Sequence, residues 1–262
     1  MDIVVFVKQV PDTESLIQIA EDRVSIKTDN IKWVINPYDE FAVEEALRIR
    51  DAHGGTVTIL SMGPQKAAEA IRTALAMGAD KGVLINDPIA EGSDALATAN
   101  ILSAAIKEIP YDLIIAGQRS VDTDNYQVAS AVAEFLGIPQ ISQVIKEEIS
   151  NGKIRCHRIM EGGTALVEAP LPVLFTTQRG LNEPRYASLP GIIKAKKKPL
   201  DIKTLADIGV DLGTVGAANV KVKVAALNFP SERKAVKMIE GDSAYAKAAV
   251  LVKVLHEEAK VI

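Results

Sequence analysis

The sequence predicts an α/β fold with a doubly wound, mostly parallel sheet, because short β-branched runs alternate with longer amphipathic stretches from residue 3 to about 137. The runs lack the alternation of apolar and polar residues that marks a half-exposed strand, so we expect strands buried on both faces. These strands are expected at 3–7, 56–60, 82–85 and 112–116. Right-handed crossovers between parallel strands then place helices on both faces of the sheet.

Helices are expected between these strands, where apolar residues recur at the spacing of one helix face. Pro64 suits the first turn of a helix, Gly78 suits a helix C-terminus, and Gly137 before Pro139 ends another helix. The expected helices span 39–52, 65–77, 94–108 and 125–136.

The sequence pattern changes after residue 140. A turn at 149–153 between two hairpin-like segments predicts a β-ribbon, and the apolar run at 172–177 predicts a return to the buried sheet. Residues 180–199 lose periodicity, and the remainder is expected to be an extended arm that ends in a helix near 242–259 and wraps around a partner. The expected organisation is an α/β domain at 1–180, an aperiodic segment at 181–200 and a C-terminal arm at 201–262.

Composition and charge exclude several classes of function. The 262 residues carry a formal net charge of −4, whereas nucleic-acid-binding domains usually carry a clustered basic excess, so no nucleic-acid partner is expected. Cys156 is the single cysteine and the histidines share no ligand spacing, so we expect neither a disulfide nor a metal site. The apolar stretches are far shorter than the ~20 residues of a membrane span, so the chain is not expected to be membrane-embedded. The absence of a leader pattern after Met1 predicts a cytoplasmic bacterial protein and leaves the mitochondrial matrix open.

No catalytic residue is expected. Neither the dinucleotide fingerprint G-x-G-x-x-G nor the P-loop G-x-x-x-x-G-K-[ST] follows an expected strand, and the nucleophile elbow G-x-S-x-G does not occur. The acidic pairs Glu44-Glu45 and Glu147-Glu148 are expected to lie in solvent, which argues against catalysis by paired carboxyl groups.

The best candidate for a ligand site is the loop 117–127, which follows the expected strand at 112–116. Ligands of open α/β sheets bind beyond the carboxyl ends of the strands, where helix N-termini favour anions. Gly117 allows close backbone approach, Ser120 and Thr123 suit phosphate oxygens, and the acidic and amide side chains suit ribose or adenine. An alternative stays open, in which Ser120, Asp122 and Asp124 only cap the helix expected from 125.

The segment 189–198 predicts a second kind of site. Here the apolar residues at 189–193 are followed directly by the basic run at 194–198. A basic run is usually only a solvated surface, but exposed leucine and isoleucine beside it are typical of a protein interface with a charged rim.

At this point the sequence resembles a known family. LNEPRYASLPGIIKAKKKPL at 181–200 is similar to the recognition loop and basic segment of electron transfer flavoprotein β subunits, and VKQVPDTES, VINPYDEFAVEEALRIR and IRTALAMGADKGVLI also resemble that family in its order. The resemblance implies an adenine-nucleotide alpha-hydrolase-like fold and an electron-transport role in processes such as fatty acid oxidation. It implies a heterodimer with an α subunit that carries most of the FAD contacts, acyl-CoA or related dehydrogenases as electron donors, and a membrane quinone oxidoreductase as acceptor.

The resemblance also implies residue roles. Leu189 would insert into an apolar pocket of a dehydrogenase, and the β subunit would bind AMP as a structural ligand. The implied docking residues are Leu189, Pro190, Ile192, Ile193, Lys194 and Lys197. The implied AMP contacts are Phe6, Val7, Asn36, Pro37, Tyr38, Asp39, Ser61, Met62, Gly117, Ser120, Val121, Asp122, Thr123, Asp124, Asn125, Gln127 and Val128.

Two departures from the family pattern affect the expected docking of the flavin domain. Ile159 stands where relatives often carry an acid, and Thr164-Ala165 follows Gly162-Gly163 where relatives usually have Glu or Gln at the second position.

Several alternatives stay open. An electron-bifurcating relative would hold a second FAD in place of AMP and oxidise NADH. The bulk of Thr123, Asn125 and Tyr126 favours AMP, and the segment AKKKPL resembles that of AMP-binding members of the family. Two further alternatives are a stand-alone adenine-nucleotide-binding enzyme and a structural scaffold without a nucleotide.

Overall fold

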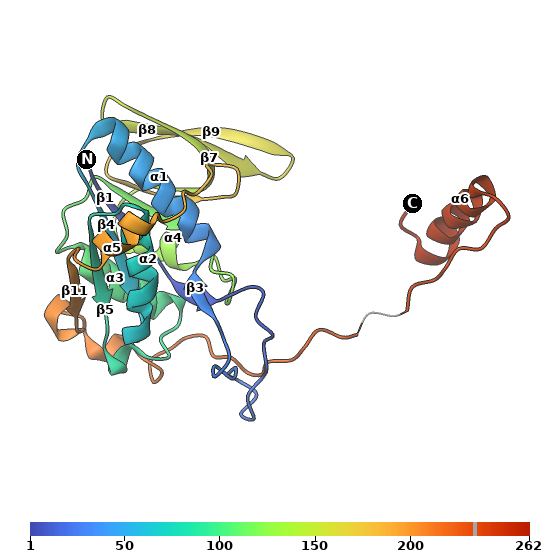
Figure 1. The fold of residues 1–262 in the computed structure, drawn as a ribbon, viewed down its shortest axis with the longest axis horizontal. Coiled ribbons are helices and arrows are strands. Elements are labelled where there is room, and N and C mark those ends of the chain that lie inside the picture. Colours follow the sequence, from blue (N-terminus) through green and yellow to red (C-terminus); the bar gives the residue numbers. More distant parts are fainter. Residues whose placement is uncertain (233–234) are drawn as a thin grey trace. The chain divides into compact units, whose positions relative to one another are not determined.

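The computed structural model describes residues 1–232 and 235–262, which form two compact units, Met1–Ala225 and Ala226–Ile262 (Figure 1). Within the described residues, the first unit is built around a nine-stranded sheet with the order β11-β5-β4-β1-β6-β10-β7-β8-β9. Neighbours from β11 to β7 run parallel, and β7, β8 and β9 pair antiparallel as a ribbon. The predicted mostly parallel α/β fold with a β-ribbon is therefore confirmed.

The parallel part of the sheet contains all the strands predicted from β-branched runs. It is formed by β1 (Asp2–Phe6), β4 (Thr56–Met62), β5 (Lys81–Ile85), β6 (Leu113–Gly117), β10 (Val173–Thr177) and β11 (Leu200–Lys203). The ribbon is formed by β7 (Gln140–Ser150), β8 (Lys153–Met160) and β9 (Gly163–Pro170).

Helices cover both faces of the sheet, and each face has its own core. Side chains of β1 alternate between these cores: Val5 faces one and Val4 faces the other. One core is covered by α1 (Pro37–His53) and α2 (Ala68–Met77), and the other by α3 (Ala95–Ile106) and α4 (Val128–Leu136). Short 3₁₀ turns lie at Gln65–Ala67, Pro88–Ala90, Ala206–Ile208 and Leu212–Thr214.

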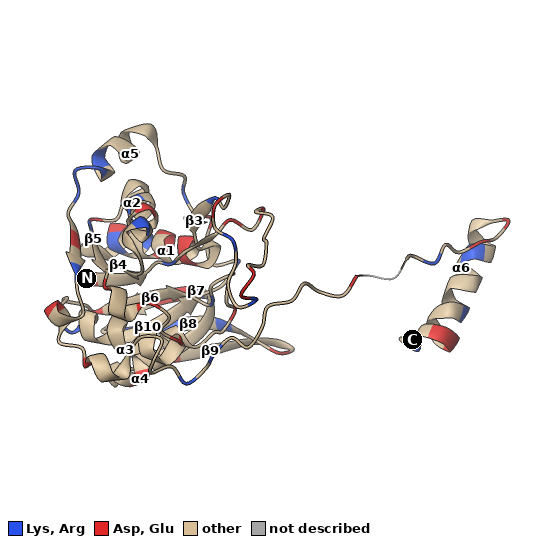
Figure 2. Cartoon of the chain, turned by 90° about the horizontal axis from the view of Figure 1, so that it is seen from below, with Lys and Arg blue, Asp and Glu red and all other residues tan. Residues whose placement is uncertain are grey.

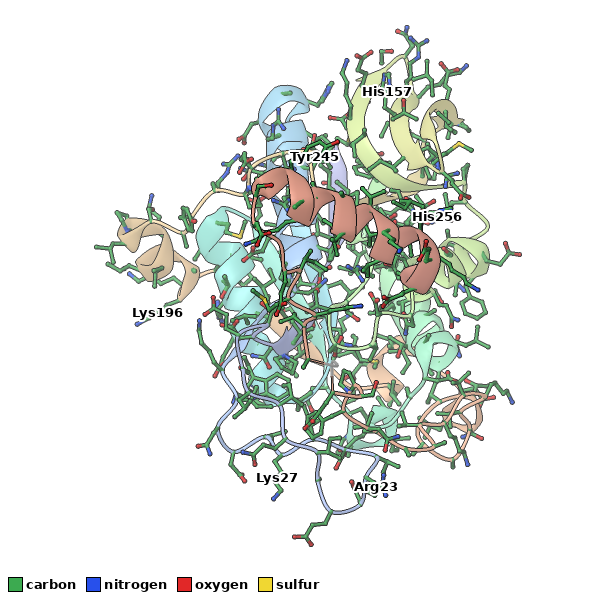
Figure 3. All side chains as sticks on the ribbon, turned by 90° about the vertical axis from the view of Figure 1, so that its right-hand side faces the viewer. Arg23, Lys27, His157, Lys196, Tyr245 and His256 are labelled. Atoms are coloured by element: carbon green, nitrogen blue, oxygen red, sulfur yellow. The ribbon has the colours of Figure 1, made fainter. Side chains whose placement is uncertain are left out.

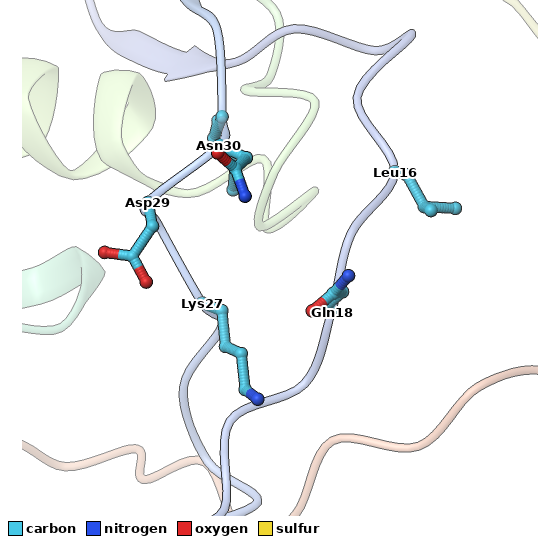
Figure 4. A pocket seen from close by; sticks show the side chains of 6 residues that line it. Leu16, Gln18, Lys27, Asp29 and Asn30 are labelled. Carbon is cyan, nitrogen blue, oxygen red and sulfur yellow. The ribbon is translucent and has the colours of Figure 1, made fainter.

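A small antiparallel pair, β2 (Gln9–Pro11) and β3 (Trp33–Ile35), lies outside the main sheet. The irregular segment between these strands surrounds a small hollow (Figure 4), lined by Leu16, Gln18, Lys27, Asp29, Asn30 and Ile31. The sequence offered no strong periodicity for such short strands, and neither was predicted.

The second unit contains α6 (Ala244–Lys253), which continues as a π-helical turn at Val254–Ala259. Its N-terminus is capped by the Ser243 hydroxyl, which accepts a hydrogen bond from the Ala246 amide at 3.1 Å. Tyr245 and His256 mark its two ends in Figure 3. No described helix is both long and apolar enough to cross a membrane.

The aperiodic segment 180–199, which was expected to contain a recognition loop, includes the helix α5 (Leu189–Ala195). Ser188 caps this helix by accepting a hydrogen bond from the Gly191 amide at 3.1 Å, and Pro190 occupies its first turn. Two helical turns are too short to show a periodic pattern. Strand β11 follows and pairs with β5, so the compact unit continues past residue 200, the boundary expected from the sequence, to Ala225.

The acidic pair Glu44-Glu45 was wrongly placed in solvent, since these side chains are only 6% and 4% exposed. Segment 181–188 crosses α1 above them: Arg185 binds Glu44 at 2.7 Å, and the Asn182 amide donates to Glu45 at 2.7 Å. Sequence patterns within α1 could not reveal a crossing by a distant segment.

Glu147 on β7 is half-buried, in contrast to its exposed neighbour Glu148. Burial raises the pKa of Glu147 to about 7, and a hydrogen bond with Glu45 and the charge of Glu45 act in the same direction. The Arg48 side chain opposes this shift, and it lies 3.4 Å from Glu45. Glu147 therefore holds its proton more readily than an exposed glutamate does.

The carboxyl pair predicts a loss of stability with rising pH. Because the folded-state pKa lies above the ordinary value of 4.5, the folded chain holds a proton that the unfolded chain releases, and stability falls between about pH 4.5 and 7. Replacement of Glu147 by Gln should stabilise the protein at pH 8 by about 1–2 kcal/mol, allowing for solvent screening, and have little effect at pH 5. Urea unfolding at both pH values tests this. The control Glu148→Gln removes a carboxylate whose pKa is lowered by Lys146, so it should not stabilise at pH 8.

Candidate functional site

The predicted ligand residues meet where the direction of the sheet reverses. From β1, the chain first adds β4 and β5 on one side and then returns to place β6 on the other side. Such a switch point leaves a crevice beyond the carboxyl ends of the strands, where ligands of open α/β sheets bind. Three groups of predicted residues lie at strand ends: Phe6 and Val7 at β1, Ser61 and Met62 at β4, and Gly117 at β6. A fourth group lies at the start of α1 and consists of Asn36, Pro37, Tyr38 and Asp39. The last group lies in the loop from β6 to α4 and consists of Ser120, Val121, Asp122, Thr123, Asp124, Asn125 and Gln127, with Val128 as the first residue of α4.

Asn36 fixes the loop after β6 to the start of α1. Its buried side-chain amide donates to the Asp39 carboxyl and to the Arg119 carbonyl, each at 2.9 Å. Its side-chain carbonyl accepts a hydrogen bond from the Val121 amide at 3.1 Å. One side chain therefore fixes the backbone of the candidate loop at two positions, Arg119 and Val121.

Asp39 ties the ends of two strands to the same helix. The carboxyl group of Asp39 accepts a hydrogen bond from the Lys8 amide at 2.7 Å, just beyond β1, and another from the Gly117 amide in β6. Burial raises the pKa of Asp39 to about 7, against the opposing effect of the hydrogen bonds from Asn36, Lys8 and Gly117. The carboxyl group also lies in the first turn of α1, where the helix dipole favours a negative charge.

Gly117 permits this close approach. A Cβ atom at this position would overlap the Asp39 carboxyl and would lie 2.8 Å from the Cβ atom of Tyr38. The glycine was predicted to serve close approach of a ligand, and the structure shows that it permits the packing of α1 against β6.

Lys8 brings a positive charge to the loop. Its ammonium group lies 2.7 Å from the Asp122 carboxylate and 3.4 Å from the Ser120 hydroxyl. The Ser120 hydroxyl is 2.8 Å from that of Thr123, whose amide donates to Asp122 at 2.9 Å. Ser120 and Asp122, which were predicted as site residues, thus lie around Lys8. Lys8 is outside the loop, so the loop sequence could not predict this contact.

Arg119 supplies a second cation. It donates to the Tyr38 hydroxyl at 2.9 Å, pairs with Asp124, and lies over the rings of Tyr38 and Tyr126 at 4.9 and 5.5 Å. Asp124 and Tyr126 have φ angles of 53° and 57°, which L residues adopt at a cost. The arginine contacts hold the loop in this strained course.

Helix α4 begins at Val128, later than the expected residue 125, and no side chain caps it. The capping alternative for Ser120, Asp122 and Asp124 is therefore wrong: these side chains contact Lys8, Thr123 and Arg119. The first amides of α4 have no side-chain acceptor, which is the condition in which a helix N-terminus binds an anion.

Ser61 has a buried hydroxyl group with no hydrogen-bond partner in the described part of the chain. A buried hydroxyl without a partner is costly, so its presence at a strand end points to a ligand. Gln118 lies within the predicted loop, where it is buried and its side-chain carbonyl accepts a hydrogen bond from the Gln143 amide at 3.0 Å. The loop sequence could not show this contact, because Gln143 lies on β7.

Comparison with known proteins decides the family. A family model described as the electron transfer flavoprotein domain matches residues 24–208. The electron transfer flavoprotein subunit beta of Bacillus subtilis is 41% identical over 264 residues, which cover 100% of both chains. The subunit beta of Thermoanaerobacterium thermosaccharolyticum is 41% identical, over 92% of this chain and 93% of its own. That of Bradyrhizobium diazoefficiens is 40% identical, over 90% of this chain and 92% of its own.

The chain belongs to the electron transfer flavoprotein β-subunit family. Membership implies an α partner subunit, a flavin in the heterodimer, and a role as an electron carrier. The resemblance inferred from the four sequence segments is confirmed.

Segment 189–198 of this electron transfer flavoprotein β chain carries exposed apolar side chains, and Figure 2 marks the positions of its basic residues in blue at the end of α5. Leu189 and Ile193 on α5 are 79% and 64% exposed, and Lys194 and Lys197 are exposed beside them. Pro190 and Ile192 complete the set of predicted docking residues on the same helix. The helix contacts α2, the helix that follows β4.

Substitution of Gly117 tests the construction of the site. Gly117→Ala should destabilise the chain by ~1–3 kcal/mol and weaken nucleotide binding, because the added methyl group displaces Asp39 and the start of α1. Thermal unfolding and nucleotide content of the purified protein provide the measurement. Gly163→Ala is the control, since its Cβ would meet no atom within 4 Å. Equal behaviour of the two variants would contradict the close-approach argument.

Proposed function

We propose that this chain is the β subunit of a heterodimeric electron transfer flavoprotein in which it binds AMP as a structural ligand, supports the flavin domain of the α subunit and docks acyl-CoA or related dehydrogenases. A quinone oxidoreductase would accept the electrons. The observation that carries the nucleotide part is the convergence of Asn36, Asp39 and Gly117 at the switch point, next to a loop with two cations.

The groups around this loop fit an adenosine monophosphate. A phosphate monoester suits the uncapped N-terminus of α4 and the cations Lys8 and Arg119. The unpartnered Ser61 hydroxyl supplies a further hydrogen-bonding group at the end of the adjacent strand β4. An AMP bound only to the folded chain stabilises it by mass action, without taking part in redox chemistry.

The size of the loop side chains favours AMP over a second FAD. Thr123, Asn125 and Tyr126 add bulk to the loop, and Tyr126 is held against the Arg119 guanidinium group. The flavin chemistry of the heterodimer would be supplied by the FAD of the α subunit. The departures Ile159 and Ala165 lie on β8 and β9 of the ribbon, opposite Thr164 and Arg158, where they would alter the surface offered to the flavin domain.

Nucleotide content tests the ligand. The heterodimer purified with its α subunit and then denatured should release one FAD and one AMP, identified by chromatography with absorption spectra. Two FAD molecules without AMP would contradict the proposal in favour of a bifurcating protein, and NADH reduction would then be examined. Release of FAD alone would show that the loop has only a structural role.

The docking part of the proposal rests on the exposed apolar residues of α5. Leu189 is among the most exposed leucines of the described chain, and the lysines beside it supply a charged rim. A few residues buried at the centre of an interface contribute most of its binding energy, and truncation of one of them can cost ~2 kcal/mol.

Leu189→Ala should lower electron transfer from an acyl-CoA dehydrogenase by about 30-fold, because the loss of such an anchor costs ~2 kcal/mol. The fold should be unaffected, since this side chain is exposed. Stopped-flow reduction of the heterodimer flavin measures the transfer rate. Leu212→Ala, which truncates an exposed leucine in the 3₁₀ turn Leu212–Thr214, is the control. An unchanged rate with every dehydrogenase that reduces the wild type would contradict the docking role of Leu189.

A further inference from the structure

The docking helix α5 is fastened to α2 by an arginine. The Arg72 guanidinium group donates from one nitrogen to the Ala195 carbonyl at 2.6 Å and to the Lys198 carbonyl at 2.8 Å. These are the carbonyls at and just beyond the C-terminal end of α5, which have no partner within the helix. Arg72 therefore caps α5 from a neighbouring helix.

Lys198 makes the reciprocal contact. Its ammonium group donates to the Leu75 carbonyl at 3.0 Å and to the Ala79 carbonyl at 2.5 Å. These carbonyls lie at the C-terminal end of α2, where the helix dipole favours a cation. Each of the two chain segments thus supplies one cation that caps the end of the other.

The backbones of α2 and α5 also touch between these contacts. A Cβ atom on Gly191 would lie 2.5 Å from the Ala76 carbonyl oxygen, so only glycine fits at this crossing. Ala195, one turn further along, is 2% exposed and belongs to the core beneath α1 and α2. The inner side of α5 is fixed along its length.

The lysines of the basic run 194–198 therefore differ in their surroundings. Lys194, Lys196 and Lys197 are exposed, and Figure 3 shows Lys196 extending outward from the helix. Lys198 is half-buried against α2. The sequence alone presents these lysines as one equivalent charged patch.

We infer that Arg72 and Lys198 are positioning residues of the docking surface, which hold α5 as a preformed helix and present Leu189 in a fixed place to a partner dehydrogenase. This inference rests on the proposed docking role of Leu189. A helix that is ordered before binding loses little conformational entropy on docking, so its fixation contributes to affinity without any contact to the partner.

The test compares Lys198→Met with Lys196→Met in the heterodimer. Both variants remove one positive charge from the same run, so they change electrostatic attraction of the partner alike, but only the first removes the contacts to Leu75 and Ala79. Hydrogen exchange of the α5 amides should be faster by about tenfold in Lys198→Met and unchanged in Lys196→Met. With an acyl-CoA dehydrogenase that reduces the wild type, Lys198→Met should raise KM about fivefold beyond Lys196→Met and leave kcat unchanged.

A double-mutant cycle separates positioning from general stability. If Lys198 acts through Leu189, the effect of Lys198→Met on KM should largely disappear in a Leu189→Ala background, whereas a separate effect would simply add. Equal exchange and equal KM in Lys198→Met and Lys196→Met, or additive effects in the cycle, would overturn the inference. A normal KM and kcat in Leu189→Ala itself would instead overturn the proposed docking function.

Discussion

The buried carboxyl group of Asp39 is the interaction on which the switch point depends. It binds the backbone beyond β1, the backbone of β6 and the side chain of Asn36, and thus joins two neighbouring strands to the start of α1. A carboxyl group in this position would be costly without partners, since burial disfavours its charged form. The donors and the helix N-terminus offset that cost, and they make the geometry of the loop depend on one residue.

Much of the fold could be predicted because its signals are local. The buried strands show as uninterrupted apolar runs, and helix ends show at Gly78 and Gly137, each of which follows the last residue of its helix. What could not be predicted arises from contacts between distant segments. Strand β11 exists because residues 200–203 find the edge of β5, and α5 is held by α2 as much as by its own residues.

The site was predictable to a similar extent. The loop after β6 could be located from topology, and its glycine and hydroxyl residues could be recognised by type. Lys8 could not be assigned, because a lysine that follows one strand reaches a loop that follows another strand only when β1 and β6 lie side by side. Arg119 lies within the predicted loop, but its contact with Tyr38 depends on the position of α1. The burial of Glu44 and Glu45 was missed for the same reason, since a segment more than a hundred residues away covers them.

Helix α1 connects the two functional regions physically. Asp39 in its first turn organises the candidate nucleotide loop, whereas Glu44 and Glu45, about one turn and a half further along, hold Arg185 and Asn182 at the start of the docking segment. Both sets of contacts are made by one continuous helix of 17 residues. The position of α1 on the sheet therefore sets the course of the loop after β6 and the course of segment 181–188 together.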